Sequence, residues 1–374
     1  MKAIITFLPG VLKLNIAFDM SFAKEEIMNR GIGRYSKNLI QHIIMLNDSH
    51  NFFYFYPDYT KEDAYLKDEL QRFITVNKID VFHILSPYYP LENHRILHRE
   101  WFGTIKVVAT IYDLIPMLYP NYYLSNPTMQ VIYNQVTNFI RSCNLLYAIS
   151  ETTKTDVVRL LGIDPNKIKV IMGGIDEQFK IDPIVNRSYF AIKYGISKPY
   201  IMNIGGADFR KNLNGLVEGF AKAKAALNNS IQLVIVYSDK QQLLSSGMVA
   251  SVFDDVIFTG YVPDEDLVKL YNGAEIVAFP SFYEGLGFPV IEAMACGTPV
   301  LTSKTSSLSE VSGDAAYLVD PYNIDEISKG LIYLMENAEL RVLLREKGLV
   351  QSAKFQWEHV AQYALEGYAK VNQK

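Results

Sequence analysis

The sequence predicts an α/β fold with two Rossmann-like, doubly wound domains, and three observations lead to this prediction. The chain has 374 residues, which is too long for one ordinary hydrophobic core. Hydrophobic residues make up 49% and charged residues 20% of it, a globular composition that excludes disordered and collagen-like chains. Short apolar runs alternate with amphipathic stretches in two successive series, which is typical of parallel sheets covered by helices.

The first series consists of short apolar runs bounded by polar or glycine residues, with helical patterns between them. The expected strands lie at residues 13–18, 52–56, 81–84, 106–111, 145–149 and 169–172. The expected helices lie at residues 33–46, 128–142 and 151–161. Ser150 stands directly before the last of these, where a hydroxyl can cap the first free N–H groups of a helix.

The second series repeats the pattern. Its expected strands lie at residues 200–204, 231–236, 256–259, 276–279, 300–302 and 316–319. Its expected helices lie at residues 213–226, 264–272, 289–296 and 324–337. The alternation breaks between residues 180 and 198, so we predict an N-terminal domain of residues 1–185 and a C-terminal domain of residues 186–356. Because doubly wound sheets bind ligands at the carboxyl ends of their strands, we expect the functional site in a cleft between the domains.

Charge and cysteine content narrow the function classes. The net charge of −4 and the pI near 5.9 disfavour a nucleic-acid binder, which normally carries a basic excess. Two distant cysteines, Cys143 and Cys296, predict neither a disulfide framework nor a cysteine metal site. No apolar stretch reaches the roughly 18 residues of a membrane span, so we expect a soluble cytoplasmic protein.

The richest stretch for chemistry is residues 280–303, PSFYEGLGFPVIEAMACGTPVLTS. A predicted strand runs into a glycine loop and then into a helix. Gly285 and Gly287 let a ligand approach main-chain N–H groups, and the helix start behind them favours an anion such as a phosphate. Glu284 stands before this loop and Glu292 lies in the helix. An isolated glutamate pair at this spacing is usually solvated, but the strand–loop–helix context favours a binding role.

Charged residues also follow two other predicted strands. Arg210 and Lys211 come shortly after the strand that ends before Gly206, and two adjacent cations at a helix entrance suit a diphosphate. Alone, such a pair is more often solvated surface. Asp113 follows the strand at residues 106–111, where a carboxylate can bind sugar hydroxyls or orient a nucleophile. The alternative is a capping Asp in a proline-rich turn.

Two weaker signals lie in the first half of the chain. Gly31 and Gly33 precede a predicted helix, but Ser36 occupies the third glycine position, so the dinucleotide-binding fingerprint fails. The glycines could still bring N–H groups towards a phosphate or a sugar, or they could simply form a tight turn. His83, at the end of a predicted strand, is the histidine best placed to reach the cleft.

The sequence does not predict a metal centre. Residues 264–266, Asp-Glu-Asp, match the DxD pattern of metal–nucleotide sites, but they stand at a helix start, where acidic side chains complement the helix dipole. We therefore interpret them as a cap. His94 and His98 have the spacing of helical zinc ligands but no HExxH context. Most of the 25 tyrosines fit core packing, although Tyr88, Tyr89, Tyr122 and Tyr123 could stack on sugars.

These segments together resemble a known family. The stretch DEDLVKLYNGAEIVAFPSFYEGLGFPVIEAMACGTPVLTS is similar to the donor-binding core of family 4 glycosyltransferases, which are retaining enzymes of the GT-B architecture. Further similar segments occur in the family's order over nearly the whole chain: GIGRY (31–35), YDLIP (112–116), AISETTKTDV (148–157), RKN (210–212), FTGYVPDEDL (258–267) and the terminal FQWEHVAQYALEGYAKV.

The resemblance implies a role for each matching residue. Glu284 would lie against the donor sugar, Glu292 would hold the ribose hydroxyls, and Arg210 and Lys211 would neutralise the donor diphosphate. Asp113 would face the acceptor or the donor sugar. The other implied donor contacts are Gly206, Tyr261, Val262, Gly285, Leu286, Gly287 and Phe288, and the other residues on the acceptor side are Gly31, Gly33, Tyr112 and His83. A helix over about residues 357–374 would pack back on the N-terminal domain.

The chain departs from the family pattern at two positions. Many relatives have a histidine before the Asp of the YDLIP-like motif, and here Tyr112 stands there. Many also have an arginine where Gly206 stands, which leaves Arg210 and Lys211 as the principal diphosphate cations. Tyr112 is typical of the polysaccharide and mannosyl-transferring subgroup.

The implied activity is transfer of a hexose from a nucleotide diphosphate sugar, GDP-mannose or a UDP-hexose, to a saccharide or lipid-linked saccharide in surface polysaccharide or glycoconjugate assembly. The favoured family mechanism is front-face attack, in which the leaving phosphate takes the acceptor proton. It implies no cofactor and no metal. A lipid-linked acceptor would bring the N-terminal domain to the inner face of the membrane. The alternatives are a nucleotide-sugar epimerase or hydrolase of the same fold, and a non-catalytic sensor of nucleotide sugars.

Overall fold

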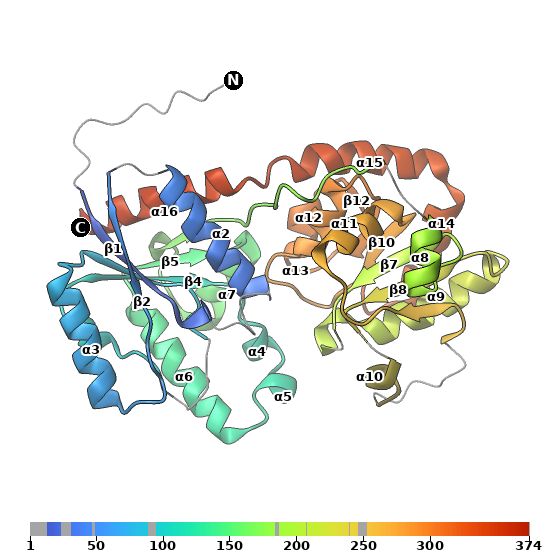
Figure 1. Ribbon diagram of the computed structural model, residues 1–374. Coiled ribbons are helices and arrows are strands. Elements are labelled where there is room, and N and C mark those ends of the chain that lie inside the picture. Colours follow the sequence, from blue (N-terminus) through green and yellow to red (C-terminus); the bar gives the residue numbers. More distant parts are fainter. Residues whose placement is uncertain are drawn as a thin grey trace. The chain divides into compact units, whose positions relative to one another are not determined.

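The protein folds into two compact units, each of which has its own sheet. A computed structural model describes residues 13–23, 31–46, 49–88, 95–183, 187–206, 208–238, 240–245 and 253–373. One unit comprises Met1–Gly173 and Trp357–Lys374, and the other comprises Gly174–Gln356 (Figure 1). Within the described part of the chain, no helix combines the length and the apolar character needed to cross a bilayer.

The first unit contains a parallel sheet of six strands in the order β2-β1-β3-β4-β5-β6. The strands are β1 (Asn15–Asp19), β2 (Asn51–Phe55), β3 (Val81–Ile84), β4 (Lys106–Ile111), β5 (Leu145–Ala148) and β6 (Ile168–Val170). Ile16 of β1 pairs with Phe52 on one side and with Val81 on the other. The chain therefore builds outwards from β1 in both directions, and the crevice between β1 and β3 is the switch point of this sheet.

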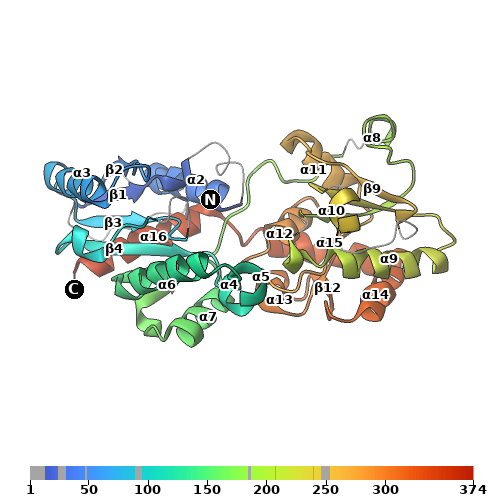
Figure 2. The ribbon, with the colours of Figure 1, turned by 90° about the horizontal axis from the view of Figure 1, so that it is seen from below.

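Helices cover both faces of the first sheet. They are α2 (Gly31–Leu46), α3 (Asp63–Val76), α4 (Ile115–Leu118), α5 (Pro120–Tyr123), α6 (Pro127–Ser142), α7 (Glu151–Leu161) and the C-terminal α16 (Trp357–Asn372). One face packs on α3, α6 and α7 through a single apolar cluster. The helices α2 and α16 lie on the other face (Figure 2). There Trp357 of α16 meets Tyr35 of α2 edge-on at 5.2 Å, and the Tyr147 hydroxyl of β5 donates to the Ala364 carbonyl at 2.6 Å.

The second unit repeats the plan with the strand order β12-β11-β10-β7-β8-β9. Its strands are β7 (Tyr200–Ile204), β8 (Gln232–Val236), β9 (Val256–Phe258), β10 (Ile276–Phe279), β11 (Val300–Ser303) and β12 (Ala316–Val319). Its helices are α8 (Arg187–Tyr194), α9 (Leu213–Ala226), α10 (Lys240–Ser245), α11 (Asp264–Gly273), α12 (Phe288–Ala295), α13 (Ser306–Ser312), α14 (Ile324–Glu336) and α15 (Ala338–Ser352). Because β7 lies between β8 and β10, the switch point of this sheet is the β7/β10 crevice.

The division between the units falls at Gly173–Gly174, earlier than the boundary at residue 185 that the break in the strand–helix alternation suggested. The intervening residues pack on the second unit. The Ile175 N–H donates to the Phe355 carbonyl at 3.0 Å, the ring of Phe179 meets that of Tyr271 edge-on, and the Asp182 N–H donates to Asn272 Oδ1 at 2.8 Å. These contacts pull the segment into the second unit although it contains no strand.

The predicted fold class is confirmed: both units are parallel α/β sheets with helices on their faces. Every predicted strand is present, with ends that shift by one or two residues. The helices that were not predicted are α3, α4, α5, α8, α10, α13 and α15.

Candidate active site

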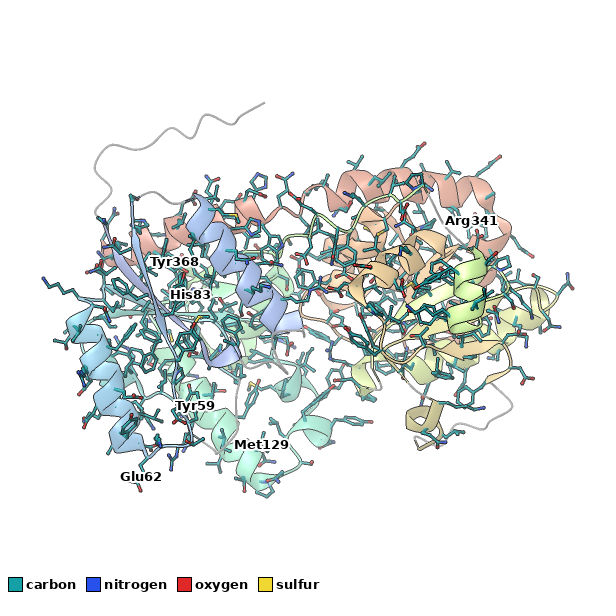
Figure 3. The ribbon with its side chains drawn as sticks, in the orientation of Figure 1. Tyr59, Glu62, His83, Met129, Arg341 and Tyr368 are labelled. Carbon is teal, nitrogen blue, oxygen red and sulfur yellow. The ribbon has the colours of Figure 1, made fainter. Side chains whose placement is uncertain are left out.

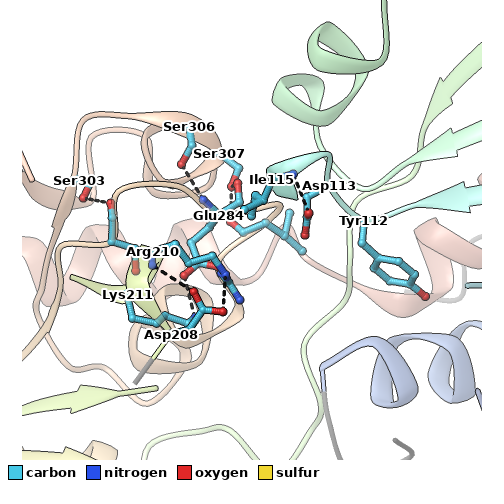
Figure 4. A network of polar contacts seen from close by, with 12 residues as sticks. Tyr112, Asp113, Ile115, Asp208, Arg210, Lys211, Glu284, Ser303, Ser306 and Ser307 are labelled. Carbon is cyan, nitrogen blue, oxygen red and sulfur yellow. Dashed lines mark hydrogen bonds and ion pairs between the residues drawn. The ribbon is translucent and has the colours of Figure 1, made fainter. Parts of the chain in front are cut away.

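The candidate active site of the second unit is built from two loops at the switch point of its sheet. After β7 the chain passes through Gly205, whose φ is +147°, into the short 3-10 turn η5 (Phe209–Lys211). After β10 it runs through residues 280–287 into α12. Because β7 and β10 are parallel neighbours, both loops leave the same edge of the sheet, and their charged side chains meet there (Figure 4).

Glu284 lies at the centre of this cluster. The Lys211 ammonium donates to Glu284 Oε1 at 2.7 Å, and the Arg210 guanidinium pairs with Glu284 Oε2 (Figure 4). The side chains are 8%, 15% and 23% exposed for Glu284, Lys211 and Arg210. The residues that the sequence singled out in two separate motifs therefore form one partly buried ion cluster, to which Asp208 adds a second carboxylate 3.6 Å from Arg210 Nε.

The environment fixes the charge state of Glu284. Burial by itself would raise the pKa of its carboxyl, but the charges of Arg210 and Lys211 and the hydrogen bonds to it outweigh burial and hold that pKa below its ordinary value. Burial also lowers the pKa of Lys211, against the opposing attraction of Glu284. Glu284 is thus an ionised carboxylate at neutral pH, which accepts hydrogen bonds and cannot serve as a general acid.

Hydroxyl groups from α13 hold the Glu284 loop in place. The Glu284 N–H donates to Ser306 Oγ at 3.1 Å. The Ser307 hydroxyl lies within hydrogen-bonding distance of the carbonyl oxygens of Glu284, at 2.8 Å, and Leu286, at 3.0 Å (Figure 4). The Phe282 N–H also donates to the Arg210 carbonyl at 2.7 Å, which joins the two loops through their backbones. The sequence reasoning missed Ser306 and Ser307, which carry no motif of their own.

Gly287 closes the loop and begins α12. Its φ is +100°, a conformation that L side chains rarely adopt. A Cβ at this position would lie 2.6 Å from Cδ2 of Leu308, so a side chain here would require Leu308 to shift. Leu286 is buried, and the helix that starts at Phe288 directs its first N–H groups towards the loop.

Glu292 has a different partner from Glu284. It lies inside α12 and is 8% exposed, and its Oε2 accepts a hydrogen bond from the Tyr271 hydroxyl at 2.8 Å. Tyr271 comes from α11 and was not singled out from the sequence. The main-chain carbonyl of Tyr271 accepts a hydrogen bond from the Thr298 hydroxyl at 2.6 Å, so Tyr271 is held through both its side chain and its main chain.

Aromatic rings follow β8 and β9 on the other side of β7. Tyr261 is 80% exposed, whereas Val262 is buried. The Tyr237 ring lies 6.2 Å from that of Tyr261, and its hydroxyl donates to the Val262 carbonyl at 3.0 Å. Gly206, which follows β7, lies near the Tyr237 carbonyl. This edge therefore offers exposed aromatic surface of the kind on which a flat base can stack.

In the first unit, the site residues predicted from the sequence lie after the carboxyl end of β4 and in α2. Asp113 Oδ1 accepts a hydrogen bond from the N–H of Ile115, the first residue of the short helix α4, at 3.0 Å. The Tyr112 hydroxyl lies 2.8 Å from Ser36 Oγ, and burial raises the Tyr112 pKa above its ordinary value. Gly31 and Gly33 both lie within α2, whose described residues start at Gly31, two residues before the predicted helix.

The prediction for His83 was wrong. Its side chain is fully buried, with Nδ1 2.6 Å from the Tyr368 hydroxyl of α16 and Nε2 2.8 Å from Thr110 Oγ1 (Figure 3). Burial lowers its pKa to about 3, so the imidazole is neutral. The alternation of side chains along β3 turns His83 towards the face covered by α16, which the position at a strand end did not reveal.

The remaining predictions concern tyrosines and acidic residues. Tyr88 stacks on Tyr133 at 4.4 Å and packs against the core, and Tyr89 lies outside the described residues.

Asp266 accepts hydrogen bonds from Tyr194, at 2.6 Å, and Lys193, at 2.5 Å, and so ties α11 to α8. Across the part of the chain that the structure describes, no group of three or more His, Cys, Asp or Glu side chains is arranged to hold a metal ion.

Comparison with known proteins identifies the family. Residues 191–350, which include the ion cluster, match the profile described as Glycosyl transferases group 1. Residues 31–179 match the profile of Glycosyltransferase Family 4. The chain belongs to the family 4 glycosyltransferases.

The curated relatives of this glycosyltransferase include two mannosyltransferases of Escherichia coli. The serotype-specific mannosyltransferase WbdA is 30% identical over 279 residues, which are 72% of this chain and 34% of WbdA. The chain therefore spans about a third of the length of WbdA. The O-antigen chain mannosyltransferase B is 28% identical over 272 residues, which are 70% of each chain.

Solved structures show that this glycosyltransferase has the GT-B fold. HepE from Anabaena, solved in complex with UDP-glucose, superposes with a TM-score of 0.70 at 16% identity over 94% of this chain and 98% of HepE. At this level of identity the likeness concerns the fold.

Proposed function

We propose that this family 4 glycosyltransferase is a retaining hexosyltransferase that moves a hexose from a nucleotide diphosphate sugar to a saccharide acceptor in polysaccharide or glycoconjugate assembly. The observation that carries the proposal is the ion cluster of Arg210, Lys211 and Glu284 at the switch point of the second sheet. Doubly wound sheets bind nucleotides in this crevice. The two matching mannosyltransferases support the reaction class.

The cluster is suited to a leaving nucleoside diphosphate. The carboxylates of Glu284 and Asp208 balance the charges of Arg210 and Lys211 while the site is empty, and a diphosphate would take over these two cations when it binds. When the glycosidic bond of the donor breaks, negative charge develops on the diphosphate, and partly buried cations stabilise it more than solvated ones would. The N–H groups at the start of α12 add to this attraction.

We assign the ionised Glu284 to the hydroxyls of the donor sugar. A carboxylate accepts hydrogen bonds from hydroxyls. Ser306 and Ser307 hold the main chain of Glu284, and Lys211 and Arg210 hold its carboxylate. Glu292, oriented by Tyr271, would accept the ribose hydroxyls in the same way. The exposed ring of Tyr261 would stack on the base, and the backbone from Gly285 to Phe288 would contact the sugar and its phosphate.

We further propose that transfer needs no divalent metal, because Arg210 and Lys211 supply the positive charge that a metal would otherwise provide. The first unit would bind the acceptor, with Asp113 and Tyr112 at the end of β4. A lipid-linked saccharide acceptor would place this unit at a membrane surface.

GDP-mannose is the first donor to test, because both matching Escherichia coli relatives are described as mannosyltransferases. UDP-hexoses come second, because the structurally similar HepE was solved with UDP-glucose. The purified chain is incubated with each donor, with and without mannose-containing oligosaccharides, in buffer with EDTA. Nucleoside diphosphate release and product mass are measured.

We expect release of nucleoside diphosphate that depends on the acceptor and an α-linked product from an α-linked donor. Release without acceptor would indicate a hydrolase or an epimerase instead. Binding of a nucleotide sugar without turnover would indicate a sensor. Activity that EDTA abolishes and magnesium restores would contradict the metal-free part alone.

A further inference from the structure

The first unit has a small cavity at the switch point of its own sheet. It lies where β1 and β3 end, and its lining includes Asp19, Tyr59, Ser86, Arg95, Val136 and Phe139. Its volume of about 20 Å³ is enough for one water molecule or one hydroxyl group. Crevices of this kind at the carboxyl ends of doubly wound strands are where such sheets bind ligands.

Asp19 supplies a buried carboxylate at this cavity. It is the last residue of β1 and only 2% exposed. The Ser21 N–H donates to its Oδ1 at 3.0 Å, and the Ser21 hydroxyl donates to its Oδ2 at 2.7 Å. Burial raises the pKa of Asp19 to about 6 despite these bonds. At neutral pH the side chain is therefore a charged acceptor held in an unfavourable place, which is a common feature of functional sites.

Arg95 supplies the opposite charge. Its Nη1 is buried and has no hydrogen-bond partner among the described residues. Its Nε lies 3.8 Å from Oδ1 of Asp63, on the outer side, and its side chain is 29% exposed. The guanidinium thus reaches both solvent and the cavity. Within the described part of the chain, Arg95 and Asp19 form no ion pair with each other, although both line the same cavity.

The two charges select the group that fits between them. The Asp19 carboxylate only accepts hydrogen bonds, and the Arg95 guanidinium only donates them. An anion would satisfy Arg95 but would be repelled by Asp19, and a cation would meet the reverse problem. A hydroxyl group donates and accepts at once, and it matches the size of the cavity. A saccharide offers such hydroxyls on an otherwise compact ring.

We propose that this cavity, which we call the switch-point pocket, binds one hydroxyl group of the saccharide acceptor. The hydroxyl donates a hydrogen bond to the Asp19 carboxylate, and Arg95 Nη1 donates one to the hydroxyl oxygen. The inference rests on the proposed glycosyltransferase function and adds the residues that would select the acceptor. The position of the pocket agrees with that role. Ser86 follows β3 and Asp113 follows β4, and these strands are parallel neighbours, so the pocket and Asp113 lie at the same edge of the sheet. The charge of Asp113 also contributes, after burial, to the raised pKa of Tyr88, two residues after Ser86.

The test compares acceptor kinetics of the full chain and two variants. Asp19→Asn keeps the shape and the contacts with Ser21 but removes the charge, and Arg95→Met removes the donor. We expect the KM for the acceptor to rise at least tenfold in each variant, with the KM for the donor unchanged. Asp68→Asn and Arg72→Met, both exposed on α3, are matched controls and should keep the wild-type KM.

A series of monodeoxy acceptors identifies the hydroxyl. The wild type should discriminate against one deoxy position at least tenfold, and Asp19→Asn should lose this discrimination. The same acceptor KM and the same discrimination in both variants would overturn the proposal and leave a structural water as the occupant.

Binding of methyl α-mannoside, followed by ligand-observed NMR, separates this inference from the proposed function. If no donor supports transfer but the sugar binds the wild type and not Asp19→Asn, the proposed function fails and the pocket stands. If transfer occurs and neither the NMR signal nor the kinetics respond to the two variants, the pocket fails and the function stands.

Discussion

The two switch points of this molecule have the same topology but opposite electrostatic arrangements. At the β7/β10 crevice the cations Arg210 and Lys211 are paired with Glu284. At the β1/β3 crevice the buried Asp19 and the partly buried Arg95 line one cavity without pairing. The first arrangement lowers the pKa of its carboxyl and the second raises it. Both sheets therefore carry charged residues at the carboxyl ends of their central strands. The pKa of each carboxyl then depends on its burial and on the charges beside it.

This difference indicates two ways of keeping a charged site stable before its substrate arrives. In the paired arrangement, Glu284 holds Arg210 and Lys211 in position until a diphosphate, which carries more negative charge, binds these cations in its place. An open pair stores unfavourable electrostatic energy that a neutral hydroxyl can relieve. The comparison predicts that substitutions at the β7/β10 crevice reduce activity, whereas removal of the Asp19 charge at the β1/β3 crevice also improves stability.

The largest expected effect is at the paired crevice. Glu284→Gln and Lys211→Ala should each lower kcat/KM for transfer roughly 100- to 1000-fold, because they remove contacts to the donor sugar and to the developing charge of the leaving group. The measurement is product formation at saturating donor, with far-UV circular dichroism to show that each variant is folded. Lys222→Ala, an exposed lysine paired with Asp325, is the matched control. Wild-type rates in both variants would remove the cluster from catalysis.

The next largest effect is a loss of stability in acid that traces to His83. Its pKa falls from 6.5 to about 3 in the folded state, so the unfolded chain binds the extra proton first. The stability that the neutral imidazole provides is complete above pH 6.5 and is lost as the pH falls towards 3. At pH 5 the loss is about 2 kcal/mol, at roughly 1.4 kcal/mol for each pKa unit.

Urea unfolding at pH 7.5 and pH 5 measures this effect in the wild type and in His83→Gln, which does not titrate. The variant should be less stable at pH 7.5, but its stability should change less between the two pH values. Because His83 lies in the core, transfer activity at pH 7.5 should remain within a few-fold of the wild type. Equal pH dependence in both proteins would contradict the buried, neutral state of His83.

An effect of comparable size and opposite sign is expected for Asp19. Its pKa rises from 3.8 to about 6 on folding, so the folded state binds more protons than the unfolded state in this range. Stability therefore falls as the pH rises through this window, and ionised Asp19 costs up to about 3 kcal/mol at neutral pH. Asp19→Asn should raise the melting temperature at pH 7.5 and not at pH 4. A lower melting temperature at pH 7.5 would show that Asp19 is a structural requirement.

The smallest effect is expected at Gly287. Alanine there must adopt a φ of +100° and place its Cβ against Leu308, which should cost about 1–2 kcal/mol and lower kcat a few-fold by displacing the Glu284 loop. Gly162→Ala is the control, because Gly162 has a φ of +66° with open space around it. Differential scanning calorimetry and kcat are compared for both. A loss in Gly162→Ala as large as in Gly287→Ala would exclude the contact with Leu308 as the cause.

The sequence predicted the paired crevice better than the open one, for a physical reason. Arg210, Lys211 and Glu284 each follow an apolar strand, and parallel strands end at the same edge of a sheet. Asp19 comes one residue after the predicted end of its strand, and Arg95 lies in a segment without periodicity. Asp19 and Arg95 come together only because the loops after β1 and β3 bring them to the same cavity, and no local sequence pattern predicts the course of these loops.

Contacts between distant segments limited the prediction elsewhere. His83 is hidden by Tyr368, and the hydroxyls of Ser306, Ser307 and Tyr271 reach the site from other elements. The helix α3 was missed because only Leu66 and Leu70 are buried in it, so its apolar stripe is narrow. Strands, which bury nearly every residue in a parallel sheet, gave a stronger signal.

The central claim is that Arg210, Lys211 and Glu284 form the diphosphate site, and calorimetric titration with nucleoside diphosphates tests it most directly. GDP and UDP are titrated into the wild type and Lys211→Ala in buffer with EDTA, with the corresponding nucleosides as controls without phosphate. We predict that one diphosphate binds the wild type, and that Lys211→Ala weakens it at least tenfold without changing the weak binding of the nucleoside. Equal affinity of the diphosphate for both proteins would contradict this account.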